Sequence, residues 1–491
     1  MTTVRITIDG TEVHAAQGAT ILEAARAAGI RIPSLCYLKD QKIKANCRVC
    51  LVKVEGMRTL QPACATAVRE GMVIYSNTPE VIDARRNSLQ LIISHHPIDC
   101  QSCVRLGNSH LEDLRDELCS MCFYCDCVAD KHCELQQLVE EYDVNAVAYE
   151  WQERHLPLDK SQVSFQVNHN KCILCRRCVE ACGDIQNINV WYVDGRGAQA
   201  KISTPGGKPL SSTACVECGQ CVRSCPVGAL YETQEFDDLL DAIQDRHTKV
   251  IARVEPYFLS EYLKRCKLDP AKYNINNLVA GLHRLGVDLV VDNSSAELQS
   301  TELMRRELVG AVVQGQAAPL ISVSCPSCVK FVEKNYPELT HLLSKTPSAQ
   351  QLFGATYQNY EGGQTYTLSL TPCSAKKLEA AAGSVNQVMS PRELDRLFVR
   401  TGVDLDCLTP APLDVVQGAA GQLDEWATPA EVGIHSATLE YGRHTISAAS
   451  VNGLQAVREI LEQVRQGRCP YQYLQLNACP KGCISTKTHL C

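Results

Sequence analysis

The 491-residue chain lacks the features that would place it in a membrane or on nucleic acid. It contains no run of about 18 apolar residues, so we expect no transmembrane segment. It has no basic block, and 48 basic against 55 acidic residues give a net charge of −7, which argues against nucleic acid as a partner. Residues 1–10 alternate polar and apolar side chains like a strand rather than a signal peptide, so we expect a cytoplasmic protein.

A phosphate-binding loop of the form G-x-G-x-x-G after a strand is also missing, so the chain shows no dinucleotide site of its own. Cysteine, in contrast, is abundant, and the 28 cysteines fall into spaced runs. Disulfide-rich scaffolds are small and secreted, whereas thiolates at C-x2-C spacing bring several soft ligands to one metal centre. This pattern suits iron–sulfur clusters or zinc. At about 150 residues per domain the length predicts roughly three or four domains, and we interpret the chain as a conductor of electrons.

Residues 1–79 are predicted to form the first domain, with two short strands around Asp9-Gly10 and a helix over residues 21–28. Four cysteines follow at C-x10-C-x2-C-x13-C spacing: Cys36, Cys47, Cys50 and Cys64. A tight loop with three thiolates, closed by a distant fourth, can hold a flat [2Fe–2S] cluster with two ligands on each iron. Four unrelated buried thiols or a zinc site are the alternatives. The strand–strand–helix order is similar to a β-grasp ferredoxin, and the domain resembles the N-terminal domain shared by the largest peripheral subunit of complex I and the long [FeFe]-hydrogenases.

Residues 80–145 resemble the next module of those proteins, a His/Cys3 [4Fe–4S] domain. His96, Cys100 and Cys103 match its pattern, but the position of the last ligand is Ser109, and a serine hydroxyl binds iron poorly at neutral pH. The sequence after Cys133 looks like the sequence that normally surrounds the missing cysteine. The resemblance therefore implies a cluster held by His96, Cys100, Cys103 and Cys133.

Four further cysteines precede Cys133 within a short stretch: Cys119, Cys122, Cys125 and Cys127. The simplest interpretation is an insertion that holds one additional [4Fe–4S] cluster. Alternatively, members of the insert pair with Cys133 and leave Cys100 and Cys103 partly free. His96 can also be merely structural, since His95 beside it could bind the iron instead.

Residues 160–235 carry a duplicated ferredoxin repeat. The spacing C-x2-C-x2-C-x3-C occurs twice, and the second copy ends in a cysteine followed by Pro226. In this repeat the fourth cysteine of each run ligates the cluster of the other run. We therefore predict one [4Fe–4S] cluster on Cys172, Cys175, Cys178 and Cys225, and a second on Cys215, Cys218, Cys221 and Cys182.

Residues 245–491 differ in character, because short apolar runs alternate with helical stretches such as Leu454–Val464. The apolar runs include Val250–Ala252, Leu289–Val291 and Leu320–Val323. This alternation predicts an α/β domain with buried parallel strands. Three segments resemble the active-site signatures of [FeFe]-hydrogenases: Ser322–Phe331, Thr371–Glu379 and Asn477–Ile484. With the N-terminal modules in their usual order, the resemblance covers nearly the whole chain and implies a hydrogenase-like H-domain here.

In that family four cysteines hold the cubane half of the H-cluster, and all four positions are filled, by Cys325, Cys373, Cys479 and Cys483. The resemblance therefore implies a [4Fe–4S] cluster at this site. The whole chain would then hold one [2Fe–2S] cluster and four to five [4Fe–4S] clusters.

The residues around these four cysteines depart from the family. The family's proton donor is the cysteine just before the first cluster ligand. Ser324 occupies this position here, and an alcohol relays protons poorly at neutral pH. The glutamate that continues the proton route falls on Leu303 or Met304. The small wall residues, the methionines and the tryptophan of the signatures are also replaced, here by Glu255, Tyr257, Thr371, Asn477 and Cys328. Lys376, which in the family grips a cyanide ligand, and Gln350 are retained, although the lysine can simply pair with a carboxylate such as Glu255.

These changes affect the proton route and the pocket walls while sparing the cubane ligands. We therefore predict an iron–sulfur electron-transfer subunit of a multisubunit oxidoreductase, without the two-iron subcluster and without H2 turnover. The resemblance implies partner subunits that bind flavin and NAD(P), with ferredoxin as a further candidate partner and electron bifurcation as a candidate activity. An active [FeFe]-hydrogenase and a redox or H2 sensor are the alternatives. Five cysteines have no cluster assigned: Cys266, Cys328, Cys407, Cys469 and Cys491.

Overall fold

The structure is a computed structural model that combines α/β and α+β regions, as the sequence predicted. It describes residues 2–39, 41–96, 133–144, 149, 155–233, 236–292, 294–315, 318–414, 431–441 and 443–483. Within these ranges, no helix combines the length and the apolar character needed to cross a membrane.

The N-terminal region contains a five-stranded sheet in the order β2-β1-β5-β3-β4. Its strands are β1 (Thr3–Ile8), β2 (Thr11–Ala16), β3 (Leu51–Val54), β4 (Gln61–Pro62) and β5 (Val73–Tyr75). The predicted hairpin turns at Asp9 and Gly10, both at positive φ (49° and 84°), a conformation that glycine adopts without strain. The predicted helix is α1 (Ile21–Ala27), whose start is fixed by a capping box between Thr20 and Glu23. The hairpin and the helix are therefore confirmed.

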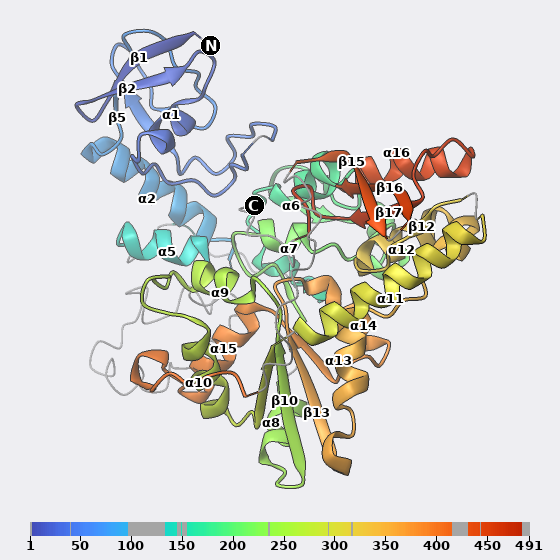
Figure 1. The fold of residues 1–491 in the computed structure, drawn as a ribbon. Helices are drawn as coiled ribbons and strands as arrows, with labels where there is room; N and C mark the ends of the chain where they lie inside the picture. Colours follow the sequence, from blue (N-terminus) through green and yellow to red (C-terminus); the bar gives the residue numbers. More distant parts are fainter. Residues whose placement is uncertain are drawn as a thin grey trace.

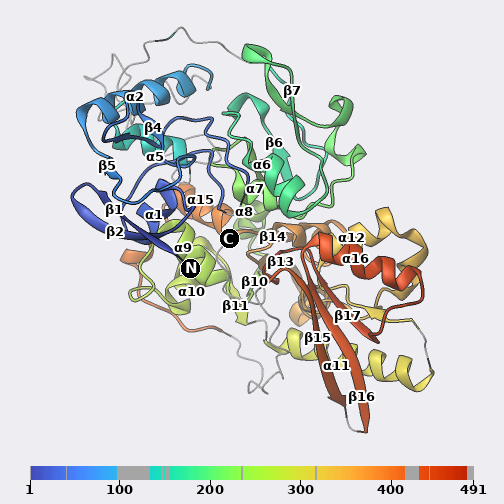
Figure 2. The ribbon, with the colours of Figure 1, turned by 90° about the horizontal axis from the view of Figure 1, so that it is seen from above.

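Two helices connect this sheet to the rest of the chain. Helix α2 (Pro79–Ile93) begins after Thr78, whose hydroxyl accepts from a first-turn N–H, and it contacts α5 (Glu134–Glu141). Their apolar faces share one core cluster with residues of the cysteine loops on either side. In both ribbon views α2 leads from the N-terminal sheet toward α5 (Figures 1 and 2). The predicted ligands Cys100 and Cys103, the insert cysteines and Ser109 lie outside the described residues.

The ferredoxin-like region has two small antiparallel sheets. Strand β6 (Phe165–Val167) pairs with β9 (Leu230–Glu232), and β7 (Tyr192–Asp194) pairs with β8 (Lys201–Ser203). Each cysteine run leads into a short helix: α6 (Arg177–Glu180), which continues as the π-helical turn η4 (Ala181–Ile185), and α7 (Gln220–Ser224). The two views agree that α6 and α7 lie between the N-terminal sheet and the C-terminal half (Figures 1 and 2).

The C-terminal half is built on two four-stranded sheets. The first, in the order β11-β10-β13-β14, is entirely parallel and consists of β10 (Thr248–Val254), β11 (Leu289–Asp292), β13 (Gln364–Leu370) and β14 (Gln387–Met389). The second has the order β12-β17-β16-β15 and consists of β12 (Leu320–Ile321), β15 (Gly433–Tyr441), β16 (His444–Asn452) and β17 (Tyr473–Asn477). Buried parallel strands are confirmed, but β15 and β16 form an antiparallel hairpin that we did not expect.

Helices cover both sheets. The first sheet shares its core with α8 (Asp237–Gln244), α9 (Phe258–Cys266), α10 (Ile275–Leu285) and α15 (Pro391–Thr401). Helices α12 (Pro326–Asn335) and α16 (Leu454–Arg465) share a core with the second sheet, and α16 confirms the helix predicted there. The remaining α-helices of the described residues in this half are α11 (Ser294–Val313), α13 (Ala349–Tyr357) and α14 (Lys377–Ala381).

Candidate metal centres

The four cysteines predicted to bind a [2Fe–2S] cluster lie together in the loop region before β3 and after β4. The thiol of Cys36 is hydrogen-bonded to the thiols of Cys47 and Cys64. The thiol of Cys50 is hydrogen-bonded to that of Cys64. Two left-handed residues, Ala45 and Arg48 (φ 51° and 57°), bend the loop around Cys47. Hydrogen bonds from Cys47 and Cys64 lower the pKa of the Cys36 thiol, which favours the thiolate, the form that binds metal.

Of the predicted His/Cys3 site, the structure describes His96 and Cys133, and both are buried (2% and 5% exposed). Cys133 caps α5, and its sulfur accepts the N–H of Gln136 at 3.4 Å. The backbone N–H of Glu134, the residue directly after Cys133, donates to the carbonyl of Pro226 at 2.8 Å. Since Pro226 follows Cys225, this bond ties the start of α5 to the ferredoxin-like region.

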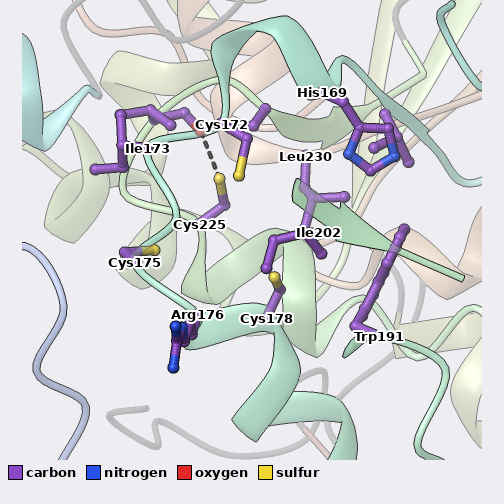
Figure 3. Close-up of a pocket in the computed structure, with 13 residues that line it drawn as sticks. His169, Cys172, Ile173, Cys175, Arg176, Cys178, Trp191, Ile202, Cys225 and Leu230 are labelled. Carbon is purple, nitrogen blue, oxygen red and sulfur yellow. Dashed lines mark hydrogen bonds between the residues drawn. The ribbon is translucent and has the colours of Figure 1, made fainter. Parts of the chain in front are cut away.

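The first ferredoxin run surrounds a hollow of about 410 Å³, part of which is open to solvent. Figure 3 shows the sulfurs of Cys172, Cys175, Cys178 and Cys225 around it, with His169 and Trp191 on another side. The thiol of Cys225, the fourth cysteine of the second run, donates to the carbonyl of Val227 at 2.7 Å (dashed in Figure 3). The structure thus places Cys225 with the first run of cysteines.

The exchange is reciprocal, because Cys182 of the first run lies among the thiols of the second. Burial raises the pKa of the Cys218 thiol, and Cys221, Cys182 and Cys215 raise it further. The sulfur of Cys182 itself accepts the N–H of Val190 at 3.3 Å. Each set of four thiols therefore contains the cysteines that the ferredoxin repeat predicts, and their role as ligands stays a prediction.

The chemistry of these buried thiols fits iron–sulfur clusters. Burial and the neighbouring thiols raise the pKa of Cys178, Cys218 and Cys221 well above the ordinary value, because thiolates crowded in a low-dielectric interior repel one another. A bound metal centre supplies the positive charge that makes such thiolates stable. In the described part of the chain, no three His, Cys, Asp or Glu side chains converge on a single metal ion.

The C-terminal site lies where parallel strands of both sheets end. Cys373 follows β13, Cys325 follows β12 and Cys479 follows β17, so the carboxyl ends of three strands deliver three of the four cysteines. Such strand ends are the usual binding position in open parallel sheets. Burial raises the pKa of the Cys479 thiol, and Cys483, Cys373 and Cys325 raise it further, so the four thiols lie within electrostatic range of one another.

The walls of this site carry a buried ion pair. Glu255 follows β10, is 6% exposed and pairs with the guanidinium of Arg253, which is fully buried. The hydroxyl of Thr371 donates to the other carboxylate oxygen of Glu255. Arg253 also donates to Ser369 Oγ at 2.8 Å. Two of the replacements found in the sequence, Glu255 and Thr371, therefore contact each other.

Lys376 belongs to a second buried pair beside the first. Its ammonium lies 2.9 Å from Glu379 Oε1, and Ser348 Oγ donates to the same carboxylate at 2.8 Å. Lys376 therefore pairs with a carboxylate, as the sequence suggested, but its partner is Glu379, three residues further along the chain, and not the example Glu255. Burial alone would lower the pKa of Lys376, but Glu379 and Glu255 raise it above the ordinary value, so the lysine stays charged. Gln350 is fully buried and donates to the Lys376 carbonyl at 3.1 Å.

The other replaced positions are distributed around the site. Ser324 is exposed, and its hydroxyl accepts from Ser322 Oγ at 3.0 Å. Tyr257 is partly buried at a left-handed position (φ 66°) before α9. Asn477 is buried and donates to Asn452 Oδ1 at 3.0 Å, so its amide joins a polar contact between β16 and β17.

The neighbouring sites are joined by direct contacts. Gln220, between two cysteines of the second ferredoxin run, donates to the sulfur of Cys479 at 3.6 Å. Gly219 lies so close to Ser374 that an added Cβ would come within 2.4 Å of its hydroxyl. At the other end, one apolar cluster contains Cys47, Cys133 and Cys172 with Cys225. A continuous series of thiol groups therefore runs from the N-terminal sheet to the C-terminal site.

Several of these residues were not predicted. Arg253 could have been found, because it interrupts the apolar strand β10 two positions before Glu255 and therefore points to the same side. Glu379, at the end of the second signature, and Gln220, inside a cysteine run, carry no comparable signal, since polar residues at such positions are common on protein surfaces.

Three family models match the chain. Residues 248–486 match "Iron only hydrogenase large subunit, C-terminal domain", residues 1–79 match "2Fe-2S iron-sulfur cluster binding domain" and residues 171–229 match "4Fe-4S dicluster domain". The chain thus contains a [2Fe–2S] domain and a [4Fe–4S] dicluster domain ahead of a hydrogenase-type domain.

Curated relatives agree with this order. The chain is 30% identical to the NADP-reducing hydrogenase subunit HndD of Solidesulfovibrio fructosivorans, over 99% of this chain and 88% of that protein. It is 25% identical to iron hydrogenase 1 of Clostridium pasteurianum, over 98% and 88% of the two chains. It is also 33% identical to the NADH-ubiquinone oxidoreductase 75 kDa subunit of Reclinomonas americana, over 46% of this chain and 29% of that protein.

Proposed function

Because the chain belongs to the family of iron-only hydrogenase large subunits, we propose that it keeps the electron-transfer role of that family without its hydrogen chemistry. It acts as an iron–sulfur subunit of a cytoplasmic, multisubunit oxidoreductase whose other subunits bind flavin and NAD(P), with electron bifurcation as a candidate activity. Its domains are 1–79, 80–145, 160–235 and 245–491. Clusters bound at the cysteine sets described above would supply one-electron transfer from site to site.

The observation that carries this proposal is the selective change at the C-terminal site. Cys325, Cys373 and Cys479 with Cys483 retain the four thiols that a cubane needs. The adjacent wall instead carries the Arg253–Glu255 ion pair, which is buried and hydrogen-bonded to Thr371. A two-iron subcluster with diatomic ligands requires small apolar walls, and a fixed, charged carboxylate opposes such ligands by its charge and its volume.

The retained lysine supports the same conclusion. In an active member of the family this lysine would be available to a ligand of the subcluster. Here the ammonium of Lys376 is paired with Glu379 at 2.9 Å, and the backbone carbonyl of Lys376 accepts a hydrogen bond from Gln350. The proton route is also changed in the sequence, because Ser324 replaces the thiol and Leu303 or Met304 replaces the glutamate.

Infrared spectroscopy of protein produced together with the hydrogenase maturation machinery tests the proposal. We expect no stretching bands of metal-bound CO or cyanide, and no H2 evolution from a reduced dye. An active iron hydrogenase matured in parallel serves as the positive control for maturation. CO and cyanide bands in this protein, together with H2 evolution, would show that an H-cluster assembles and would refute the proposal in favour of an active hydrogenase.

The partner subunits are tested by anaerobic purification from the native source. We expect a complex in which flavin and an NAD(P)-dependent diaphorase activity copurify with the chain, while the isolated chain contains iron and sulfide but no flavin. An isolated chain that is fully active with H2 and a dye would contradict this part of the proposal.

A further inference from the structure

Cys328 is a fifth thiol at the C-terminal site. It lies in the first turn of α12, three residues after Cys325, and is 1% exposed. Its thiol is hydrogen-bonded to the sulfur of Cys325. Cys479 and Cys483 also lie close enough to act on Cys328 electrostatically. The residue is therefore part of the thiol group around the cluster site and not an isolated cysteine.

The four predicted ligands also act on one another. Cys373 is influenced by Cys483 and Cys325, and Cys479 by all three of the others. A cubane presents four iron corners to the protein, and these four thiols are sufficient for them. An ordinary thiol keeps its proton at neutral pH, so the S–H group of Cys328, which is not among the four ligands, can donate a hydrogen bond.

We propose that Cys328 is a hydrogen-bond donor to the C-terminal [4Fe–4S] cluster, in which its S–H group donates to the Cys325 sulfur and favours the reduced state. This inference rests on the cubane assigned in the proposed function. Reduction adds negative charge to the cluster and its sulfur ligands, and a hydrogen bond to a more negative acceptor is stronger. Hydrogen bonds to the ligand sulfurs are among the features that set cluster potentials.

The surrounding structure fixes the donor in place. Cys328 is packed in a core cluster with Phe331 and with Val216 of the second ferredoxin run. Two lysines of α12 hold the helix against that run: Lys330 pairs with the buried Glu217, and Lys334 donates to the Thr213 and Cys215 carbonyls at 2.9 Å. A helix held at these points cannot easily turn Cys328 away from Cys325.

Three variants of the full chain test the proposal: Cys328→Ala, which removes the donor; Cys328→Ser, which keeps an O–H donor; and Cys469→Ala as a matched control. Cys469 is a half-buried thiol packed against the same core cluster, and it donates to the Tyr471 carbonyl. The readouts are iron content, EPR-monitored redox titration and the S–H stretching band in infrared difference spectra of oxidised and reduced protein.

For Cys328→Ala we expect unchanged iron content and an about tenfold lower ratio of reduced to oxidised C-terminal cubane at a fixed solution potential, equivalent to about 59 mV for one electron. Cys328→Ser should recover most of this loss, and Cys469→Ala should leave the ratio unchanged. In the unmodified chain one S–H band should move to lower frequency on reduction, and this shift should be missing from Cys328→Ala.

Other results would overturn the inference. Loss of about four irons in Cys328→Ala would make Cys328 a ligand, and an unchanged ratio with an unshifted S–H band would show that it is only a core thiol. Both results differ from those expected if the proposed function is wrong. If the proposed function is wrong, Cys373→Ala leaves the iron content unchanged, or the unmodified chain shows CO and cyanide bands.

Discussion

The two ferredoxin cysteine runs and the C-terminal site present the same ligand chemistry in different surroundings. At the first run the four thiols face mainly apolar residues such as Ile202 and Leu230, although His169 and Arg176 also line the hollow. At the C-terminal site the four thiols lie beside two buried ion pairs, Arg253–Glu255 and Lys376–Glu379. This difference supports our proposal that the cysteines specify which cluster binds, whereas the surrounding side chains specify which further ligands and protons that cluster can use.

We expect the largest effect from variants that remove one predicted cluster ligand from each region. Cys178→Ala and Cys373→Ala should each lower the iron content by about four per chain and abolish one [4Fe–4S] EPR signal, because a cubane that loses a thiolate is no longer held at all corners. Iron analysis and EPR of the reduced proteins measure the effect. If Cys373→Ala leaves both unchanged, the C-terminal site holds no cubane and the comparison fails.

The cysteine-rich insert should behave like the ferredoxin runs. Replacing Cys119 and Cys122 together by serine should remove about four irons while the other cluster signals persist, because four closely spaced thiolates match one cubane. Ser109→Ala is the matched control and should leave the spectrum intact, whereas Cys133→Ser should degrade it. Unchanged iron content in the double variant would refute an additional cluster.

The ion pair beside the C-terminal thiols should matter strongly for stability. Glu255→Gln leaves the fully buried Arg253 without its carboxylate, and breaking a buried pair in this way costs about 3–5 kcal/mol. The unfolding midpoint of the C-terminal half should fall by roughly 10 °C in calorimetry. Glu302→Gln, which breaks the exposed pair with Arg306 on α11, is the control and should cost less than about 1 kcal/mol. Equal effects of the two variants would contradict the conclusion that the buried Arg253–Glu255 pair stabilises the C-terminal half.

The buried carboxylate of Glu232 should make the free energy of unfolding depend on pH. Burial alone would raise the pKa of Glu232, but its pairing with Arg392 at 2.7 Å lowers it to about 2. A lowered pKa stabilises the fold at a pH above the unfolded value of 4.5, by about 3 kcal/mol, and this stabilisation is lost as the pH falls toward 2. Glu232→Gln should therefore be less stable at pH 7 and lose the difference near pH 2, as measured by calorimetry across this range. A constant difference would show that charge is not the cause.

The smallest expected effect concerns the contact between the two regions. Gln220→Leu removes the amide that donates to Cys479 at 3.6 Å, a long and therefore weak bond. The ratio of reduced to oxidised C-terminal cubane at a fixed potential should fall by a factor of about two to five. The first ferredoxin cluster should be unaffected, since Cys479 does not belong to it. A shift of both clusters would point to a rearrangement instead of a lost hydrogen bond.

The sequence by itself determined which thiols belong together in the ferredoxin-like region. Its spacing predicted that Cys225 joins the first run and Cys182 the second, and the structure places them so. It also predicted the N-terminal hairpin, α1, α16 and the parallel strands, because local turn chemistry and periodicity are properties of neighbouring residues. The outlying thiol Cys64 could be grouped with the others through spacing and resemblance together.

Only the tertiary structure decided how the polar residues of the C-terminal site are paired. The partner of Lys376 is Glu379 and the partner of Glu255 is Arg253, whereas the sequence suggested only that Lys376 pairs with a carboxylate, with Glu255 as an example. Both carboxylates lie near the lysine in space, so the choice depends on the direction in which each strand end and helix presents its side chain. Spacing along the chain fixes which residues share a strand or a turn, but packing between separate strands and helices fixes the distances between charges.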